Sequence, residues 1–503
     1  MAIRKVLGVE TEYGIIVRGG DSNPIAASSV LINAYVQHLA SRGAATGATR
    51  VGWDFEDEMP GNDARGFSAE GQLPPEVETH LVNAVLTNGA RYYVDHAHPE
   101  LSTPECADPR TVVVYDRAAE LILQRSMEAA TTLLPDGQEI VVYKNNSDRK
   151  GNSYGTHENY LMDRAVPFGK IVSHVMPHFI TRQIFTGAGK VGTEAAGLTS
   201  ADVPYQLTQR ADFFEEEVGL ETTLKRPIVN TRDEPHADAQ KYRRLHVIVG
   251  DANLSEVATF LKVGTTALVL SMIEDDWLTR DLLPAKPVQA LRQVSYDLTL
   301  ARPIELADGS SITALEAQWE LFDRGRKFAE EHGLECIGGD DVGQEVLRRW
   351  EAALHGLETD PGTLATTVDW VAKHRLLDGY RERHDLRWDD ARLAAMDLQY
   401  HDLRPARSLA ARVGLERIAT DAEATAAMTD PPPDTRAYFR GRCLQRWPES
   451  IVAANWDSLV FDVGGDPLRR VPMMEPLRGT EAHVGTLIDD SENATDLLQK
   501  LGQ

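Results

Sequence analysis

Cysteine, positive charge and long apolar runs are all scarce in this 503-residue chain. The three cysteines, Cys106, Cys336 and Cys443, lie far apart, which argues against a disulfide framework or a zinc ribbon and is typical of a reducing compartment. The longest apolar stretch, TTALVLSMI, is far below the roughly 18 residues of a membrane span. Glu10 and Glu12 precede any apolar run of signal-peptide length. We therefore expect a soluble, cytoplasmic protein that does not act at a membrane.

The charge balance is strongly acidic. Lys and Arg number 52 and Asp and Glu number 77, which gives a formal net charge of −25. Binding along a nucleic-acid backbone requires clustered Lys and Arg, so this balance argues against a nucleic-acid partner. The hydrophobic share of 42% and charged share of 26% are ordinary for a globular protein.

Familiar catalytic motifs are absent as well. The run TGAGKVG resembles a phosphate-binding loop, but Ile184 stands where that loop needs Gly, and Val191 where it needs Ser or Thr. HENYL begins like a zinc-protease helix, yet Leu161 replaces the second His. Neither motif predicts a function here.

The hydrophobic pattern predicts a mixed fold. Strand-like runs alternate irregularly with helical patterns, which favours an α+β architecture with a largely antiparallel sheet. We expect strands within 3–17, 111–116, 139–144, 153–162 and 243–251, and helices at 28–40, at 117–134, after an N-cap at Ser255, and before a C-cap at Gly333. The hydrophobic pattern predicts that residues 310–430 are almost wholly helical.

Two segments suggest boundaries in the chain. Pro431, Pro432 and Pro433 interrupt the helical pattern, so we predict a large domain at 1–430 and a small C-terminal domain at 431–503. Residues 41–79 hold six glycines and an acidic cluster, and their few apolar residues show no period. We predict a flexible insertion there, which is either functional or simply solvated.

Carboxylates, histidines and arginines recur at strand spacing. Because side chains two apart point to the same face of a strand, Glu10 pairs with Glu12, Tyr93 with Asp95, His157 with Asn159, and Arg244 with His246. Such oxygen ligands suit Mg²⁺ or Mn²⁺, and arginines hold phosphates. By itself, a strand Glu pair is more often a solvated face, a single His is more often structural, and Asp95 could equally cap a turn. Spacing alone does not bring the segments together.

Taken together, four segments resemble one family. GVETEYG, NGARYYVDHAHPELSTPEC, NSYGTHENYLM and RRLHVIVGDANLSE, in this order, are similar to the Pup-processing branch of the carboxylate–amine ligase (glutamine-synthetase-like) superfamily. The Trp- and Arg-rich stretch at 439–462 is similar to that branch's small C-terminal domain. The resemblance implies a curved antiparallel sheet forming a cradle, backed by helices, with ATP and Mg²⁺ at one end.

The resemblance also implies roles for individual residues. Carried over by position, Glu10, His157 and His246 match one metal site, and Glu12, Tyr93 and Glu100 match the surroundings of a second, where Tyr93 departs from the usual carboxylate. Arg232 and Arg244 match phosphate contacts, Asn159 matches a nucleotide contact, and Trp456 and Arg440 match contacts to nucleotide or substrate. Asp95 is the expected catalytic residue, either attacking the γ-carbonyl or orienting the attacking water or phosphate.

Within the branch, DHAHPE and the insertion at 41–79 resemble the deamidase and depupylase rather than the ligase. This implies an ATP- and Mg-dependent amidohydrolase that converts the C-terminal Gln of Pup to Glu and cleaves the isopeptide bond between Pup and substrate lysines. ATP would be required but not consumed stoichiometrically, and the partners would be Pup and pupylated proteins, with a functional link to the proteasome. The alternatives are a Pup–protein ligase, a small-molecule glutamate–amine ligase and an inactive binding protein of this fold.

Overall fold

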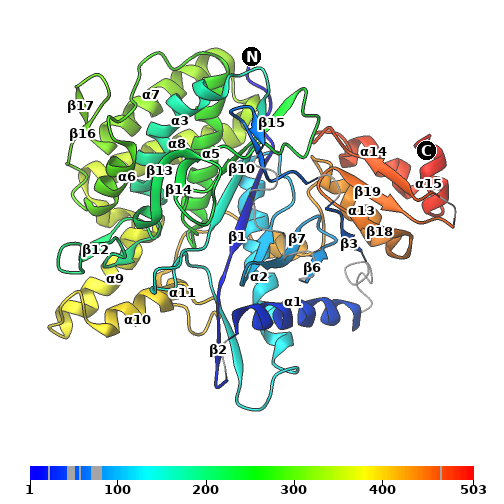
Figure 1. Ribbon diagram of the computed structural model, residues 1–503, viewed down its shortest axis with the longest axis horizontal. Coiled ribbons are helices and arrows are strands. Elements are labelled where there is room, and N and C mark those ends of the chain that lie inside the picture. The colour runs from blue at the N-terminus through cyan, green and yellow to red at the C-terminus, as the bar shows by residue number, and fades with distance from the viewer. Residues whose placement is uncertain (21–22, 42–50, 56–57, 69–81, 465–466, 503) are drawn as a thin grey trace.

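A six-stranded antiparallel sheet runs through the centre of the molecule (Figure 1). The computed structural model describes residues 1–20, 23–41, 51–55, 58–68, 82–464 and 467–502. The sheet has the order β15-β10-β1-β8-β7-β6. Its strands are β1 (Leu7–Glu12), β6 (Asn83–Val85), β7 (Arg91–Asp95), β8 (His98–Ser102), β10 (Thr156–Asp163) and β15 (Tyr242–Val247). Next to it, β2 (Gly14–Arg18) pairs with β9 (Glu139–Tyr143).

Side chains alternate between the two faces of this sheet. On β1, Leu7, Val9 and Thr11 are buried, whereas Gly8, Glu10 and Glu12 are partly exposed on the other face. The apolar face packs against helices: Tyr160 and Leu245 belong to the largest core cluster. The sequence pattern thus leaves the polar side chains of several strands together on the open face, which we call the cradle face.

Helices cover the apolar face and extend the fold on one side. The longer ones are α1 (Pro24–Ser41), α2 (Pro109–Ala130), α3 (Phe168–Thr181), α5 (Glu256–Glu274), α6 (Pro287–Tyr296), α7 (Ala314–His332), α8 (Asp340–Thr359), α9 (Asp369–Arg383) and α10 (Ala391–Tyr400). Shorter ones are α4 (Gln183–Thr186), α11 (Ala410–Val413) and α12 (Asp421–Ala426). Within the described residues, α5 alone has the length and hydropathy of a membrane span, and it is wholly buried, as a core helix is.

Short strand pairs complete this part of the fold. They are β4 (Asn62–Asp63) with β5 (Phe67–Ser68), β11 (Lys190–Val191) with β12 (Tyr205–Gln206), β13 (Phe214–Gly219) with β14 (Arg226–Asn230), and β16 (Ile304–Glu305) with β17 (Ser311–Ile312). Of these pairs only β13 and β14 run parallel. They connect the helices to the loops around the cradle face.

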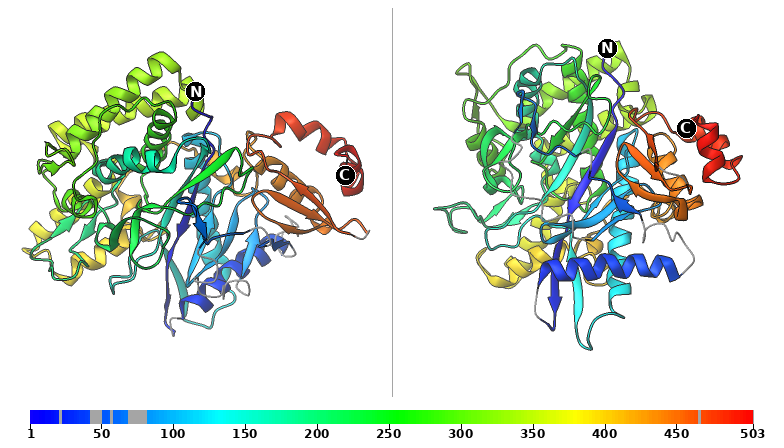
Figure 2. Two further views of the ribbon diagram at one scale, coloured as in Figure 1. Left: turned by 45° about the horizontal axis from the view of Figure 1, so that its top comes forward. Right: turned by 45° about the vertical axis from the view of Figure 1, so that its right-hand side comes forward.

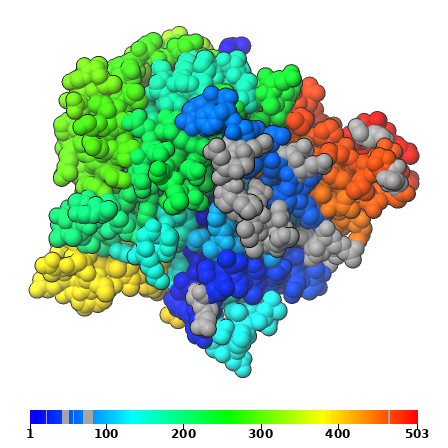
Figure 3. Space-filling view, in the orientation of Figure 1, coloured from blue at the N-terminus to red at the C-terminus, as the bar shows by residue number. Residues whose placement is uncertain are grey.

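The C-terminal residues form a lobe beside the sheet, which two further directions of view also show (Figure 2). The space-filling view in the orientation of Figure 1 shows this lobe at the right-hand side of the molecule (Figure 3). This C-terminal lobe comprises α13 (Ala437–Arg446), β18 (Ile451–Ala454), β19 (Ser458–Phe461), β20 (Arg469–Pro472), α14 (Glu481–Asp489) and α15 (Ala494–Lys500). Its sheet has a fourth strand, β3 (Gly52–Trp53), which pairs in parallel with β18. The lobe therefore includes a strand from the predicted insertion. The domain boundary at the triple proline stays a prediction.

Most of the expected elements are present, and the α+β prediction is confirmed. Ser255 caps α5 by accepting from the Ala258 amide, and Gly333, at φ 74°, follows α7. The strand expected at 111–116 is wrong, because those residues lie in α2. Asp108 caps that helix by accepting from the Thr111 amide, and Pro109 occupies its first turn, so local start signals outweigh the β-branched run.

The insertion is described only in part. Residues 51–55 and 58–68 include β3, β4 and β5, whereas 42–50, 56–57 and 69–79 lie outside the described residues. The predicted flexibility of 41–79 therefore stays a prediction for those residues.

Candidate active site

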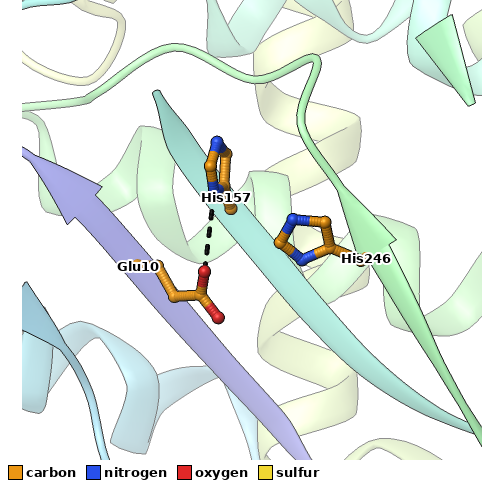
Figure 4. A group of neighbouring side chains, drawn as sticks. All are labelled: Glu10, His157 and His246. Atoms are coloured by element: carbon orange, nitrogen blue, oxygen red, sulfur yellow. Dashed lines mark ion pairs between the residues drawn. The ribbon is translucent and has the colours of Figure 1, made fainter. Parts of the chain in front are cut away.

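Three side chains meet at the centre of the cradle face (Figure 4). Glu10 on β1 lies opposite His157 on β10, and Asn159 on β10 lies opposite His246 on β15. One ligand atom from each of Glu10, His157 and His246 lies within 4.8 Å of the others. His157 Nδ1 is 3.5 Å from Glu10 Oε2. A carboxylate and two imidazoles at this separation form a candidate site for a divalent cation.

Neighbouring groups orient this trio. Asn159 Nδ2 donates to Glu10 Oε1 at 2.8 Å, and Arg244 Nη1 donates to Asn159 Oδ1 at 2.6 Å. Burial raises the pKa of the Glu10 carboxyl, but the hydrogen bond with His157 and the positive charge of Arg244 are among the causes that outweigh burial and hold that pKa well below its usual range. Burial and then Arg244 lower the pKa of His246, so its imidazole is neutral and keeps a lone pair.

A second group of carboxylates lies along β1, β7 and β8. Glu12 is opposite Glu100, and Glu100 is opposite Tyr93. Burial, followed by the negative charges of Asp95, Glu12 and Glu10, raises the pKa of Glu100 well above its usual range. Burial and then Asp95 also raise the pKa of Glu12, which accepts a hydrogen bond from the Gly155 amide at 2.8 Å. The negative charges of these buried, neighbouring carboxylates repel one another.

This donor set fits a bound cation. The negative charges of Asp95, Glu12 and Glu10 raise the proton affinity of Glu100, and Asp95 also raises that of Glu12. Positive charge from a divalent ion would relieve this repulsion. Oxygen ligands suit Mg²⁺, and imidazoles widen the choice to Mn²⁺ and related ions. Tyr93 contributes a neutral phenol, because burial and then Glu100 raise its pKa well above the usual value.

The expected catalytic residue lies at the edge of this carboxylate group. Asp95 ends β7 opposite His98, and its charge acts on Glu12 and Glu100. His96 Nδ1 is 3.0 Å from Asp95 Oδ1. His96 itself has a left-handed backbone, at φ 51°, which the tight turn between β7 and β8 requires. Asp95 is therefore placed beside the candidate metal site.

A cavity opens on the cradle face next to Glu10. Gly8, Glu10, Asn159, Arg244 and Trp456 are among its lining residues, so three of the expected nucleotide contacts share one cavity with a candidate metal ligand. The C-terminal lobe supplies the Trp456 wall, and the sheet supplies the floor. A nucleotide in this cavity would have its phosphates next to Glu10.

The remaining two expected contacts behave differently. Arg232 lies close enough to Arg244 and His246 for its charge to act on both, and its buried Nε has no hydrogen-bond partner among the described residues. Arg440 is wholly buried, and its guanidinium binds Glu105 and the carbonyls of Gly89 and Trp456. The structure thus gives the Arg440 guanidinium protein partners, and its expected contact to nucleotide or substrate stays a prediction.

Sequence reasoning also missed residues at this site. His98 Nδ1 is 3.7 Å from Glu12 Oε2, and its ring packs on Tyr154. His98 lies two residues before Glu100 on the same strand, so the alternation of side chains could have placed it on the same face as Glu100. Glu105 and Arg436 also line the cavity, but they are 331 residues apart in the chain, and no local pattern relates them.

Several known proteins are similar to this chain over most of its length. The model of the family described as Pup-ligase protein matches residues 5–460. A depupylase of Acidothermus cellulolyticus is 51% identical, covering 99% of both chains. A Pup deamidase/depupylase of Mycolicibacterium smegmatis is 46% identical, covering 99% of this chain and all of the relative. A Pup–protein ligase of Nakamurella multipartita is 42% identical, covering 81% of this chain and 90% of the relative.

Solved structures show the same fold. The Pup ligase PafA in complex with Pup superposes with a TM-score of 0.78 at 31% identity, covering 97% of this chain and 91% of the ligase. PafA in complex with ADP superposes with a TM-score of 0.73 at 36% identity, covering 81% of this chain and 89% of the ligase. The expected cradle architecture is therefore confirmed.

Proposed function

This chain belongs to the Pup-ligase protein family, and from that premise we propose that the cradle face is the active site of a Pup deamidase and depupylase. Relatives that match 99% of this chain at 46–51% identity bear the names depupylase and Pup deamidase/depupylase. Relatives named as ligases are more distant, at 37–42% identity. This difference is the observation that carries the assignment. The enzyme is a hydrolase of amide and isopeptide bonds, and its partners are Pup and pupylated proteins.

Deamidation and depupylation both hydrolyse an amide bond at the same side-chain carbonyl, and they differ only in the amine that leaves. Water adds to the γ-carbonyl of the last Pup residue, and either ammonia or a lysine amine departs, leaving Glu at the Pup C-terminus. Asp95 is the group that attacks that carbonyl or orients the attacking water or phosphate. Its location beside Glu12 and Glu100 supports this role. The arginines behind the site, Arg244 and Arg232, supply positive charge where oxygen anions develop.

The cofactors follow from the donor set and the cavity. Gly8, Asn159, Arg244 and Trp456 would hold a nucleotide in the cavity that they line. Glu10, His157 and His246 would hold one Mg²⁺, and Glu12, Glu100 and Tyr93 would hold a second. Bound Mg²⁺ supplies Lewis acidity and neutralises phosphate charge. The reaction takes place in the cytoplasm, in keeping with three free, buried cysteines.

The proposal is tested by following the mass of Pup. The protein is incubated with Pup ending in Gln, ATP and Mg²⁺, and separately with a pupylated protein. We expect conversion of Gln to Glu and release of the lysine protein. Asp95→Asn should lower both rates at least a thousandfold while nucleotide binding is retained. Attachment of Pup to lysines, without deamidation, would instead identify a ligase.

A further inference from the structure

A buried ion network joins the C-terminal lobe to the main sheet. Glu105 follows β8, and its carboxylate meets Arg436 and Arg440 at the start of the lobe. Arg436 Nε donates to Glu105 Oε1 at 2.8 Å, and Arg440 Nη1 donates to the same oxygen at 3.2 Å. Arg440 Nη2 donates to Glu105 Oε2. Both arginines are buried, at 3% and 0% exposure, so this contact is shielded from solvent.

The same network reaches the wall of the cavity. Arg440 Nη1 also donates to the Trp456 carbonyl at 3.0 Å, and the guanidinium carbon lies 5.2 Å from the Trp456 ring centroid. Arg440 Nη2 donates to the Gly89 carbonyl at 2.9 Å. Because a guanidinium presents its donors in a rigid fork, one side chain fixes all three partners together. The location of Trp456 is thus set by the side chain that binds Glu105.

We propose that Glu105 is a positioning residue for the nucleotide: it orients Arg440 and, through Arg440, holds the Trp456 wall of the cavity in its binding geometry. The proposal rests on the proposed nucleotide site. Glu105, Arg436 and Trp456 all line the cavity, so the network forms part of its surface. A wall that is fixed before binding lowers the cost of ordering it when nucleotide enters.

The electrostatics require the carboxylate charge. Burial raises the pKa of Glu105, but Arg440 and Arg436 outweigh burial and hold it at about 2, so the carboxylate is ionised at neutral pH. Removing that charge would leave two buried cations facing each other without their shared anion. Arg440, whose Nη1 donates to both Glu105 and the Trp456 carbonyl, would then lose its charged partner.

The test is Glu105→Gln, which keeps the size of the side chain. Its amide places an N–H donor where one carboxylate oxygen accepts from Arg440. We expect the Kd for ATP and ADP, measured by calorimetry, to rise about tenfold or more, with kcat at saturating nucleotide within about threefold of the parent. The matched control is Glu128→Gln, since Glu128 pairs with Arg125 on the exposed face of α2. This control should leave nucleotide Kd unchanged.

A double-mutant cycle tests whether Glu105 affects nucleotide binding through Trp456. If Glu105 acts through Trp456, Glu105→Gln should raise Kd little further in a Trp456→Ala background. Additive effects, or a lowered unfolding midpoint with unchanged Kd, would overturn the proposal. Should Glu105→Gln fail to fold, Arg440→Lys, which keeps the charge but not the fork, is expected to weaken nucleotide binding in the same way. A parent protein that binds neither ATP nor ADP would contradict the nucleotide site itself.

Discussion

Replacing Glu10 by Gln should remove most of the stabilisation that Mg²⁺ gives this protein through the site formed by Glu10, His157 and His246. Glu10 is the only carboxylate of the trio with His157 and His246, and Arg244 Nη1 is 3.9 Å from its Oε1. At about 4 Å and an effective dielectric constant near 20, one unit-charge attraction amounts to about 4 kcal/mol. A hundredfold loss of cation affinity corresponds to about 2.7 kcal/mol, which is less than this attraction, so we expect at least that loss.

The size of the effect follows from binding linkage. At a Mg²⁺ concentration of about 100 times the parent's Kd, binding stabilises the folded state by about 2.7 kcal/mol. With Kd a hundredfold higher, the same concentration gives about 0.4 kcal/mol. Without Mg²⁺ the variant should be less stable than the parent, because it lacks the negative charge that faces Arg244, although the Gln carbonyl still accepts the Asn159 hydrogen bond of 2.8 Å. The comparison is therefore made on the Mg²⁺-dependent difference within each protein.

The assay is denaturant unfolding with Mg²⁺ and with a chelator, on the parent, Glu10→Gln and the surface control Glu128→Gln. The control should retain the full difference between the two conditions, since its carboxylate is exposed on α2. An equal Mg²⁺-dependent gain in Glu10→Gln and the parent would refute Glu10 as a ligand.

Three further predictions concern the surroundings of the site. Glu158→Gln should lower the free energy of unfolding by about 3–5 kcal/mol in denaturant titrations, because the buried Arg182 guanidinium, whose two Nη atoms donate to the Glu158 carboxylate at 2.6 and 2.7 Å, loses its charged partner. An unchanged free energy of unfolding would contradict this. Gly8→Val should weaken nucleotide binding at a nearly unchanged unfolding midpoint, because a Cβ there makes ordinary contacts with Thr103 Oγ1 at 3.5 Å and the Pro104 carbonyl oxygen at 3.9 Å, while Gly8 lines the cavity. An unchanged Kd would place the nucleotide elsewhere. The folded pKa of Glu105 is depressed to about 2, so its stabilisation is complete above its usual pKa and disappears as pH falls toward 2; acid titrations should show that Glu105→Gln lacks this part of the parent's pH dependence.

Local patterns were enough to assign faces of strands. The two-residue repeat in GVETEYG and THENY predicted that Glu10 would share a face with Glu12, and His157 with Asn159, and the structure has both pairs on the cradle face. The reason is geometric, since a strand turns alternate side chains to opposite sides whatever it pairs with. Helix ends at Ser255 and Gly333 were equally local, because caps depend on neighbouring backbone groups.

Local pattern misled at residues 111–116. A β-branched run favours a strand, but Asp108 and Pro109 start a helix there, and burial against the sheet and α5 keeps its valines inside. Propensity is a weak preference, and tertiary packing overrides it.

The sequence by itself determined the residue types of the site, the face of each strand and the family. Only the tertiary structure decided which strands meet: the register that sets Glu10 against His157 and Glu12 against Glu100 joins segments far apart in the chain. It also buried Arg440 against Glu105 and brought Trp456 to the cavity. Such contacts depend on long-range pairing and on packing of the whole core, and neither leaves a periodic trace in the sequence.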